Sequence, residues 1–165
     1  MRWSKRRKLV EESFAPSVRG RVRVFSTHYS CSCGYASIVA DGKQIAEFNT
    51  RLHFANVDWV SDEENPGWAR KIVQPIEASE RSKYPLSVPR EFSRFDFNES
   101  CWQLLHTNPH AALEADDPML AALAVLHRKV GVGRVRSLRD RDIHPLVRWA
   151  VEFRLDAQST HKASP

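Results

Sequence analysis

Residues 117–131 read DPMLAALAVLHRKVG, and this stretch decides the fold. Asp117 can accept hydrogen bonds from the free N–H groups of a first helical turn, and Pro118 suits the first helical position because it has no N–H to leave unpaired. Apolar residues cover most of the helix that follows, so we expect it in the centre of the core. Cations near its C-terminal end suit the helix dipole, and Gly131 can supply the left-handed residue that ends it. The apolar residues are Met119, Leu120, Ala122, Leu123, Ala124, Leu126 and Val130, and the cations are His127, Arg128 and Lys129.

The chain before this helix predicts one helix and three strands. A narrow apolar stripe predicts an amphipathic helix over residues 4–14. From residue 18 to 29 apolar residues alternate with arginines, which is typical of a strand with one buried and one solvated face. Asp41-Gly42 suits the two positive-φ positions of a type I′ turn, so residues 35–40 and 43–50 should pair as a hairpin. The alternation places Val18, Val22 and Val24 on one face and Arg19, Arg21 and Arg23 on the other.

Beyond residue 50 the pattern is mainly helical. An Asn, Asp or His followed by Pro marks helix starts at residues 65–66, 108–109, 117–118 and 144–145. We expect residues 51–68 to be irregular and acidic, 83–95 to be a loop, 97–106 to be a helix, and 131–138 to be a short strand or extended turn. After the first start, Trp68, Ile72 and Ile76 recur at helical spacing. Trp102 and Leu105 should face inward in the helix over 97–106, and one face of the last helix should carry Leu146, Trp149, Ala150 and Phe153.

This order of elements predicts an α+β fold. It begins with an N-terminal helix, continues as a three-stranded antiparallel meander, and ends with four to five helices packed on one face of the sheet. Residues 1–158 are expected to form a single domain, and residues 159–165, which lack apolar anchors, a disordered tail.

Composition narrows the class of protein. The 165 residues are 42% hydrophobic and carry a formal net charge of +5, which is enough apolar content for a core and enough positive charge to attract an acidic partner. Three cysteines do not form a disulfide framework, so we expect a cytoplasmic protein. We expect neither a secretory signal nor a membrane span, because no long apolar run follows the basic N-terminus.

Three sequence features carry a resemblance to a known family. The chain opens with MRWSK, and Asp41-Gly42-Lys43 is followed much later by the stretch LHRKVG at residues 126–131. The chain resembles a family of small, largely uncharacterised bacterial cytoplasmic proteins that begin Met-Arg-Trp-Ser-Lys and carry a late Leu-Asp-Arg-Arg-Val-Gly stretch. His127 and Lys129 stand where that family has Asp and a second Arg, so any pairing of that Asp with arginines is lost here. The resemblance implies a compact α+β domain and no established reaction.

Chemical motifs are sparse. His28, Cys31 and Cys33 give an H-x2-C-x-C spacing, with His53 and Cys101 available at a distance, but a Cys-x-Cys pair begins a zinc site poorly and no second pair follows. Ordinary thiols in a loop explain these residues better, and we expect no metal and no cofactor. The acidic run at residues 62–64 is more typical of a solvated helix start than of a metal site.

One pattern resembles that of a ribonuclease. Arg139 and His144 have the R-x4-H spacing of some small all-helical ribonucleases, in which such a pair flanks the scissile phosphate. Arg23 and His28 match the same spacing inside a predicted strand, which shows how easily an arginine-rich chain produces it. We therefore expect no catalytic residues and a protein that is not an enzyme.

The remaining feature is the segregation of charge. Arginines and lysines crowd the N-terminal helix and first strand and again the last quarter of the chain. If the two ends meet, they form one basic face; alternatively, they pair with the acids in between. Our first hypothesis is a non-enzymatic protein that docks an acidic protein partner, such as an immunity-type toxin inhibitor, and the alternative is a nucleic-acid-binding protein that uses the same face. The expected partner-binding residues are Arg6, Arg7, Arg19, Arg21, Arg23, Arg134, Arg136, Arg139 and Arg141.

Overall fold

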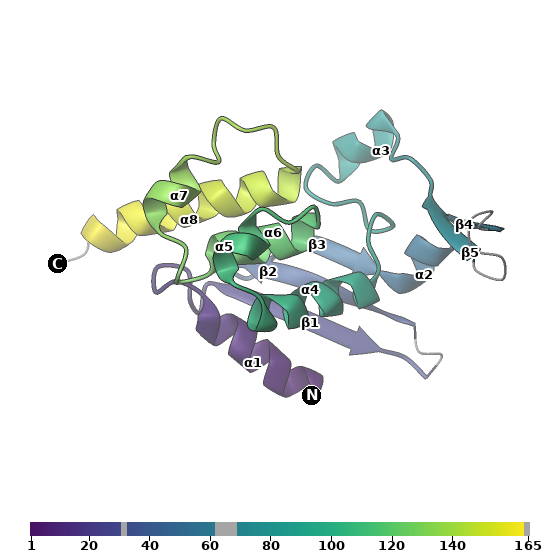
Figure 1. Cartoon of the computed structure of the whole chain (residues 1–165), viewed down its shortest axis with the longest axis horizontal. Helices are drawn as coiled ribbons and strands as arrows, with labels where there is room; N and C mark the ends of the chain where they lie inside the picture. Colours follow the sequence, from purple (N-terminus) through teal and green to yellow (C-terminus); the bar gives the residue numbers. More distant parts are fainter. Residues whose placement is uncertain (31–32, 62–68, 164–165) are drawn as a thin grey trace.

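The computed structural model describes residues 1–30, 33–61 and 69–163 and confirms the α+β fold. An N-terminal helix precedes a three-stranded sheet, a small hairpin follows, and helices make up the rest (Figure 1). The elements are α1 Trp3–Ser13, β1 Val22–His28, β2 Gly34–Ala40, β3 Lys43–Asn49, α2 Thr50–Phe54, β4 Val57–Ser61, β5 Ala69–Val73, α3 Ala78–Lys83, α4 Arg94–His106, α5 Pro109–Leu113, α6 Pro118–Leu126, α7 Val132–Arg136 and α8 Pro145–Ala163.

The sheet is the predicted antiparallel meander, in the order β1-β2-β3. Asp41 and Gly42 have φ angles of 48° and 78°, so the turn between β2 and β3 has positive φ at both central residues, as expected. The predicted first strand is shortened at its start, because residues 18–22 turn and the Val22 N–H donates to the carbonyl of Val18 at 3.1 Å. Strand alternation then gives the sheet one buried and one open face.

The core lies between the buried face of the sheet and the helices. Phe97 of α4 stacks on Phe48 of β3 with ring centroids 4.8 Å apart, which seats α4 against the sheet. Helix α6 packs against α4, α5 and α8, and every residue from Met119 to Leu126 is buried. The predicted central helix is therefore confirmed, including the Asp117 side chain that accepts from the N–H of Met119 at 2.9 Å.

Helix α6 ends earlier than expected. His127 is its C-cap, so the three cations expected in its last turn lie beyond the helix. Gly131 does not end it; with a φ of −69° it is the N-cap of α7, and residues 132–136 are helical where we expected an extended segment. Helix α6 can end without a glycine because Arg154 of α8 caps it. The Arg154 guanidinium donates to the carbonyls of Val125, His127 and Val130.

The segment after β3 differs most from the expectation. Residues 51–61, expected to be irregular, contain most of α2 and all of β4, and the expected helix after residue 65 is instead strand β5. Strand β5 pairs with β4, and Ile72, whose spacing from Ile76 suggested a helix, lies in the strand and is 37% exposed. A short run with few apolar residues fits both the helical and the strand periodicity. Pairing with β4 makes this run a strand. The acidic run and the proline at residues 62–66 lie outside the described residues.

Smaller corrections concern the later helices. Helix α4 begins at Arg94 and buries Phe97, Cys101 and Leu104, whereas Trp102, expected inward, is 41% exposed. Helix α3 ends at Lys83, where the loop was expected to begin. Helix α8 continues through Ala163, so residues 159–163 of the expected tail are helical. None of the helices in the described part of the chain combines the length and apolarity of a membrane span.

Candidate functional site

The arginines of the last quarter of the chain are mostly engaged by the protein itself. Glu114 accepts from Arg134 at 2.7 Å and from Arg141 at 3.0 Å, and Glu152 accepts from Arg139 at 2.5 Å. Hydrogen bonding by Arg141 and Arg134 lowers the pKa of Glu114, so this carboxylate keeps its charge. Of the four site residues expected here, Arg136 alone is exposed without a polar contact within the described ranges.

Among the N-terminal arginines, Arg6 and Arg21 are engaged outside the groove described below. Arg6 is half-buried and donates to the carbonyl of Asn98 on α4 at 2.9 Å. Arg21 makes a two-pronged ion pair with Asp41, at 2.9 and 2.7 Å, and its guanidinium lies 4.8 Å from the ring centre of Phe153. These two arginines hold elements together and do not face a common groove.

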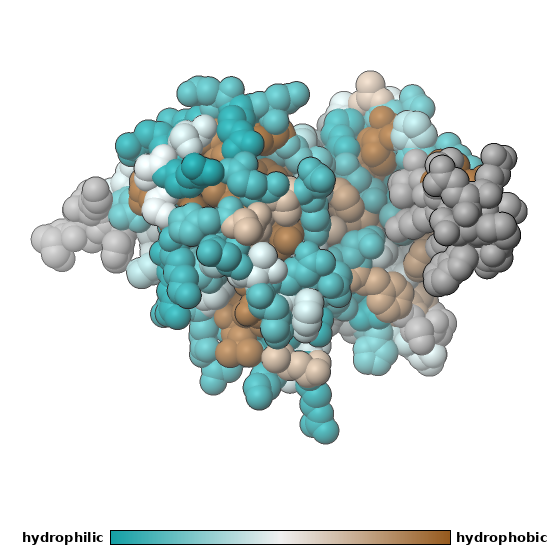
Figure 2. All heavy atoms as spheres, viewed as in Figure 1, coloured by the Kyte–Doolittle hydropathy of each residue, from teal (hydrophilic) through white to brown (hydrophobic). Residues whose placement is uncertain are grey.

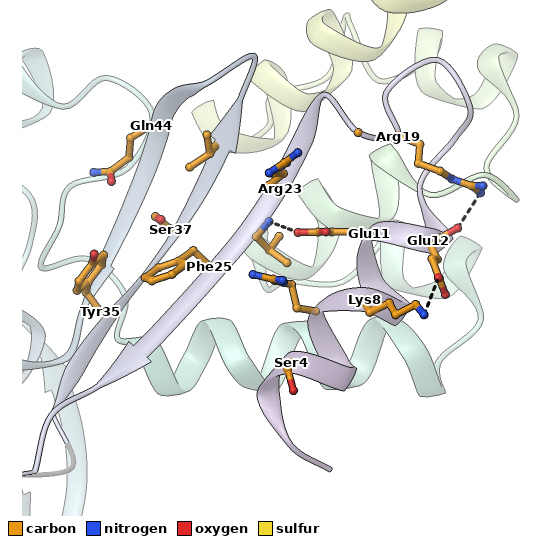
Figure 3. Close-up of a pocket in the computed structure, with 14 residues that line it drawn as sticks. Ser4, Lys8, Glu11, Glu12, Arg19, Arg23, Phe25, Tyr35, Ser37 and Gln44 are labelled. Atoms are coloured by element: carbon orange, nitrogen blue, oxygen red, sulfur yellow. Dashed lines mark hydrogen bonds and ion pairs between the residues drawn. The ribbon is translucent and has the colours of Figure 1, made fainter.

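The other three N-terminal arginines do meet. Arg7, Arg19 and Arg23 line one groove of about 780 Å³ between α1 and the open face of the sheet (Figure 3). Lys8 adds a fourth cation, and Glu11 and Glu12 lie in the same wall. Three of the nine expected binding residues therefore line one groove, which is built by α1, the residue 19–20 turn and β1. The two ends of the chain do not share it, because none of the C-terminal arginines lines this groove.

Local hydrogen bonds fix the walls of the groove. Arg19 donates to the carbonyls of Glu12 and Phe14, which satisfies the end of α1 where the helix dipole attracts a cation. The Glu11 carboxylate accepts from the N–H of Val24 at 3.0 Å and so joins α1 to the edge of the sheet. These contacts hold α1 at a set distance from β1, and Figure 3 shows both walls facing the groove.

The floor of the groove carries an aromatic pair that the sequence did not single out. Phe25 of β1 and Tyr35 of β2 lie side by side on the open face, with ring centroids 5.7 Å apart, and Phe25 is 39% exposed. Arg23 lies two residues from Phe25 on the same face of β1 (Figure 3). The alternation that predicts an outward Arg23 also predicts an outward Phe25. The exposed position of Phe25 could therefore have been predicted from the sequence of this strand.

Two cations in the groove remain available. Arg7 and Arg23 are exposed, and neither makes a side-chain hydrogen bond or ion pair within the described part of the chain. The visible face in Figure 2 is largely hydrophilic, with apolar side chains in small separate groups. Free guanidinium groups beside the exposed ring of Phe25 and the partly buried ring of Tyr35 are suited to binding, since Arg, Tyr and Phe are residue types enriched in protein interfaces.

No catalytic or metal centre is assembled from the other candidates. Arg139 pairs with Glu152, while His144 lies 3.1 Å from Glu91, so the two members of the R-x4-H pattern have different partners. In the described ranges no three His, Cys, Asp or Glu residues are placed to hold a metal ion. Cys31 of the H-x2-C-x-C spacing lies outside the described residues, and Cys101 is buried in the core, which raises the pKa of its thiol.

Comparison with known proteins identifies one family for this chain. No curated protein and no solved structure matches the chain. One family model does match, over residues 2–155, which is nearly the whole of the chain and includes α1, the sheet and α6. On this match the chain belongs to the SF0329 protein family.

Proposed function

We propose that this protein is a non-enzymatic binding protein that docks an acidic segment of a partner protein in the groove between α1 and the open face of the sheet. The observation that carries the proposal is the pair of exposed, unpaired guanidinium groups, Arg7 and Arg23, beside the exposed ring of Phe25. Charged groups on the partner would set its orientation and the rate of association, and the aromatic floor would supply apolar contact.

The mixture of charges in the groove supports a protein partner. Glu11 and Glu12 lie in the wall that contributes Arg7 and Lys8. A phosphate backbone running along the groove would meet these carboxylates, whereas a folded partner can offer acids opposite Arg7 and Arg23 and other side chains opposite Glu11 and Glu12. One form of such docking is an immunity-type role, in which the protein inhibits a toxin in the cytoplasm by binding an acidic surface of it.

Nucleic-acid binding is a second candidate, and the aromatic pair favours it. Aromatic rings on an open sheet face beside arginines are a platform on which single-stranded bases can stack. Phe25 and Tyr35 lie on that face next to Arg23. In this case log affinity would fall with log salt by about 0.7 for each phosphate neutralised on a single strand.

Charge reversal tests the proposal. The variant Arg7→Glu/Arg23→Glu is compared with Arg128→Glu/Arg136→Glu, which makes the same change in net charge at exposed residues outside the groove. Tagged proteins are used to recover partners from cell extract, and each purified complex is then measured by titration calorimetry. We expect the groove variant to lose at least about tenfold in affinity for an acidic partner and the control variant to bind like the wild type.

Two results would count against a protein-docking groove. The first is equal loss of binding in both variants, which would show a response to net charge alone. The second is tight binding of a labelled single-stranded oligonucleotide, measured by fluorescence anisotropy, that depends on Phe25 and Tyr35; this would favour the second candidate.

A further inference from the structure

A second pocket lies elsewhere in the molecule and has the opposite charge. It encloses about 600 Å³ and shares no lining residue with the basic groove. Its walls come from α2, the loop before α4, α4 itself and the start of α6, and no lysine or arginine is among the residues that line it. The lining residues are His53, Glu91, Phe92, Asp96, Glu99, Asp116, Asp117, Pro118 and Met119.

Three of the five carboxylates have structural duties. Asp96 forms the capping box of α4 with Ser93, Asp117 caps α6 and accepts from the hydroxyl of Ser100 at 2.5 Å, and Glu91 pairs with Arg81. Glu99 and Asp116 are exposed and lie at the mouth. Acids alone do not define a binding site, but one buried residue of the lining is a histidine.

That residue is His53, which is 1% exposed and lines the pocket. Its Nδ1 lies 2.9 Å from the carbonyl oxygen of Arg90, and because a carbonyl can only accept, Nδ1 carries the proton. In the neutral ring Nε2 then holds a lone pair, yet Nε2 is buried and has no hydrogen-bond partner. A buried acceptor without a donor is energetically unfavourable, so the site is incomplete as it stands.

The geometry around Nε2 indicates what would complete it. The nearest carboxylate oxygen, Asp96 Oδ2, lies 3.9 Å from Nε2, too far for a direct hydrogen bond. A nitrogen with several N–H groups can sit at hydrogen-bond distance from both atoms at once. Since the described residues do not include three placed to hold a metal ion, a compact hydrogen-bond donor fits this arrangement better than a metal.

We propose that this pocket binds a primary alkylammonium group. The ammonium donates to His53 Nε2 and Asp96, Glu99 and Asp116 supply the negative field, and the methylene chain lies against Phe92, Pro118 and Met119. Two sources share this chemistry: a free diamine or polyamine, and the lysine side chain of a protein.

The test follows His53 directly. The full-length protein, labelled with ¹⁵N, is titrated with cadaverine, and separately with a blocked tripeptide Gly-Lys-Gly, while the Nε2 resonance of His53 is recorded. Saturable movement of that resonance, absent with sodium chloride at the same ionic strength, is the expected result. Stronger binding of cadaverine identifies a small amine as the natural source, and stronger binding of the peptide identifies a lysine side chain.

Variants at the mouth keep the test independent of folding. Glu99→Gln/Asp116→Asn removes two exposed acids that cap no helix, and Asp140→Asn/Asp156→Asn makes the same change in charge outside the pocket. We expect the first variant to bind at least about tenfold more weakly and the second to bind like the wild type. No movement of Nε2, movement reproduced by sodium chloride, or equal weakening in both variants would overturn the proposal.

Discussion

His127 is a buried histidine in positive surroundings. It is 7% exposed, and its Nδ1 accepts from the N–H of Lys129 at 3.1 Å. Burial, and then the charges of Lys129, Arg128, Arg154 and His110, lower its pKa from 6.5 to about 4. The folded protein therefore keeps this ring neutral at pH values where the unfolded chain protonates it.

A pH dependence of stability follows from this lowered pKa. Between about pH 6.5 and 4 the unfolded state binds more protons at His127, so its contribution to the free energy of unfolding falls as the pH falls, by up to ~1.4 kcal/mol per pH unit. Urea unfolding over this range should show the slope, and His127→Gln should flatten it. His127→Asp should stabilise the fold at pH 7 by about 1 kcal/mol, because its carboxylate is attracted to the cations around this position. An unchanged slope in His127→Gln would exclude this residue as the cause.

At the scale of elements, Glu91 joins three parts of the chain. Its carboxylate accepts from Arg81 of α3 at 2.5 Å, from the N–H of Val88 at 3.1 Å, and from Nε2 of His144, just before α8, at 3.1 Å. Burial raises the pKa of Glu91, but the hydrogen bonds from His144 and Arg81 outweigh it and lower the pKa to about 2. One charged group thus attaches the loop between α3 and α4 to α3 and to the residue that precedes α8.

Replacing this carboxylate should loosen the attachment. We expect Glu91→Gln to lower the free energy of unfolding at pH 7 by ~2 kcal/mol, because buried charged hydrogen bonds are lost. The difference from the wild type should be present above about pH 4.5 and shrink as the pH falls toward 2, where the wild-type carboxyl becomes protonated. Urea unfolding measures both effects. Glu114→Gln is the control, because Glu114 makes two exposed ion pairs, and it should change the free energy of unfolding by less than ~1 kcal/mol. An equal loss of stability in both variants would contradict the special role of Glu91.

Elements with strong local signals were predictable from the sequence, and those set by a distant partner were not. Asp117-Pro118 and the apolar run fixed α6, and Asp41-Gly42 fixed the β2–β3 turn. Strand β5 was mistaken for a helix because its character comes from pairing with β4. The end of α6 was misplaced because Arg154, 28 residues beyond Leu126, supplies the cap. Contacts between residues far apart in the sequence cannot be predicted from local sequence patterns.

At the scale of the whole molecule, charge was predictable in amount but not in arrangement. The sequence shows which segments are basic, but the engagement of Arg134, Arg139 and Arg141 depends on glutamates that folding brings beside them. Only part of the expected basic face remains, around Arg7 and Arg23. His53 gave no sequence signal beyond its residue type, because its unpaired nitrogen arises from the loop carbonyl that fixes its ring.

The edge of the sheet leads to a prediction about self-association. In the described chain β1 is an edge strand, and the carboxylate of Glu11 occupies the N–H of Val24. Glu11→Ala should leave that donor unpaired and allow edges of two molecules to meet, so the sedimentation coefficient should rise with concentration more steeply than for the wild type. Glu11→Gln retains an acceptor oxygen and should match the wild type. Identical sedimentation of all three proteins would show that α1 shields the edge without this contact.

Arg154 also determines when the molecule can finish folding during its synthesis. Phe14 and the buried face of β1 leave the ribosome early, but the Ser13–Ala15 segment pairs with residues 126–128, and Arg154 secures that turn later still. Contacts between such distant parts of a chain form slowly. A nascent chain that has not reached residue 154 therefore has an incompletely packed core. Chaperones that bind apolar surface would protect this core until α8 has been synthesised.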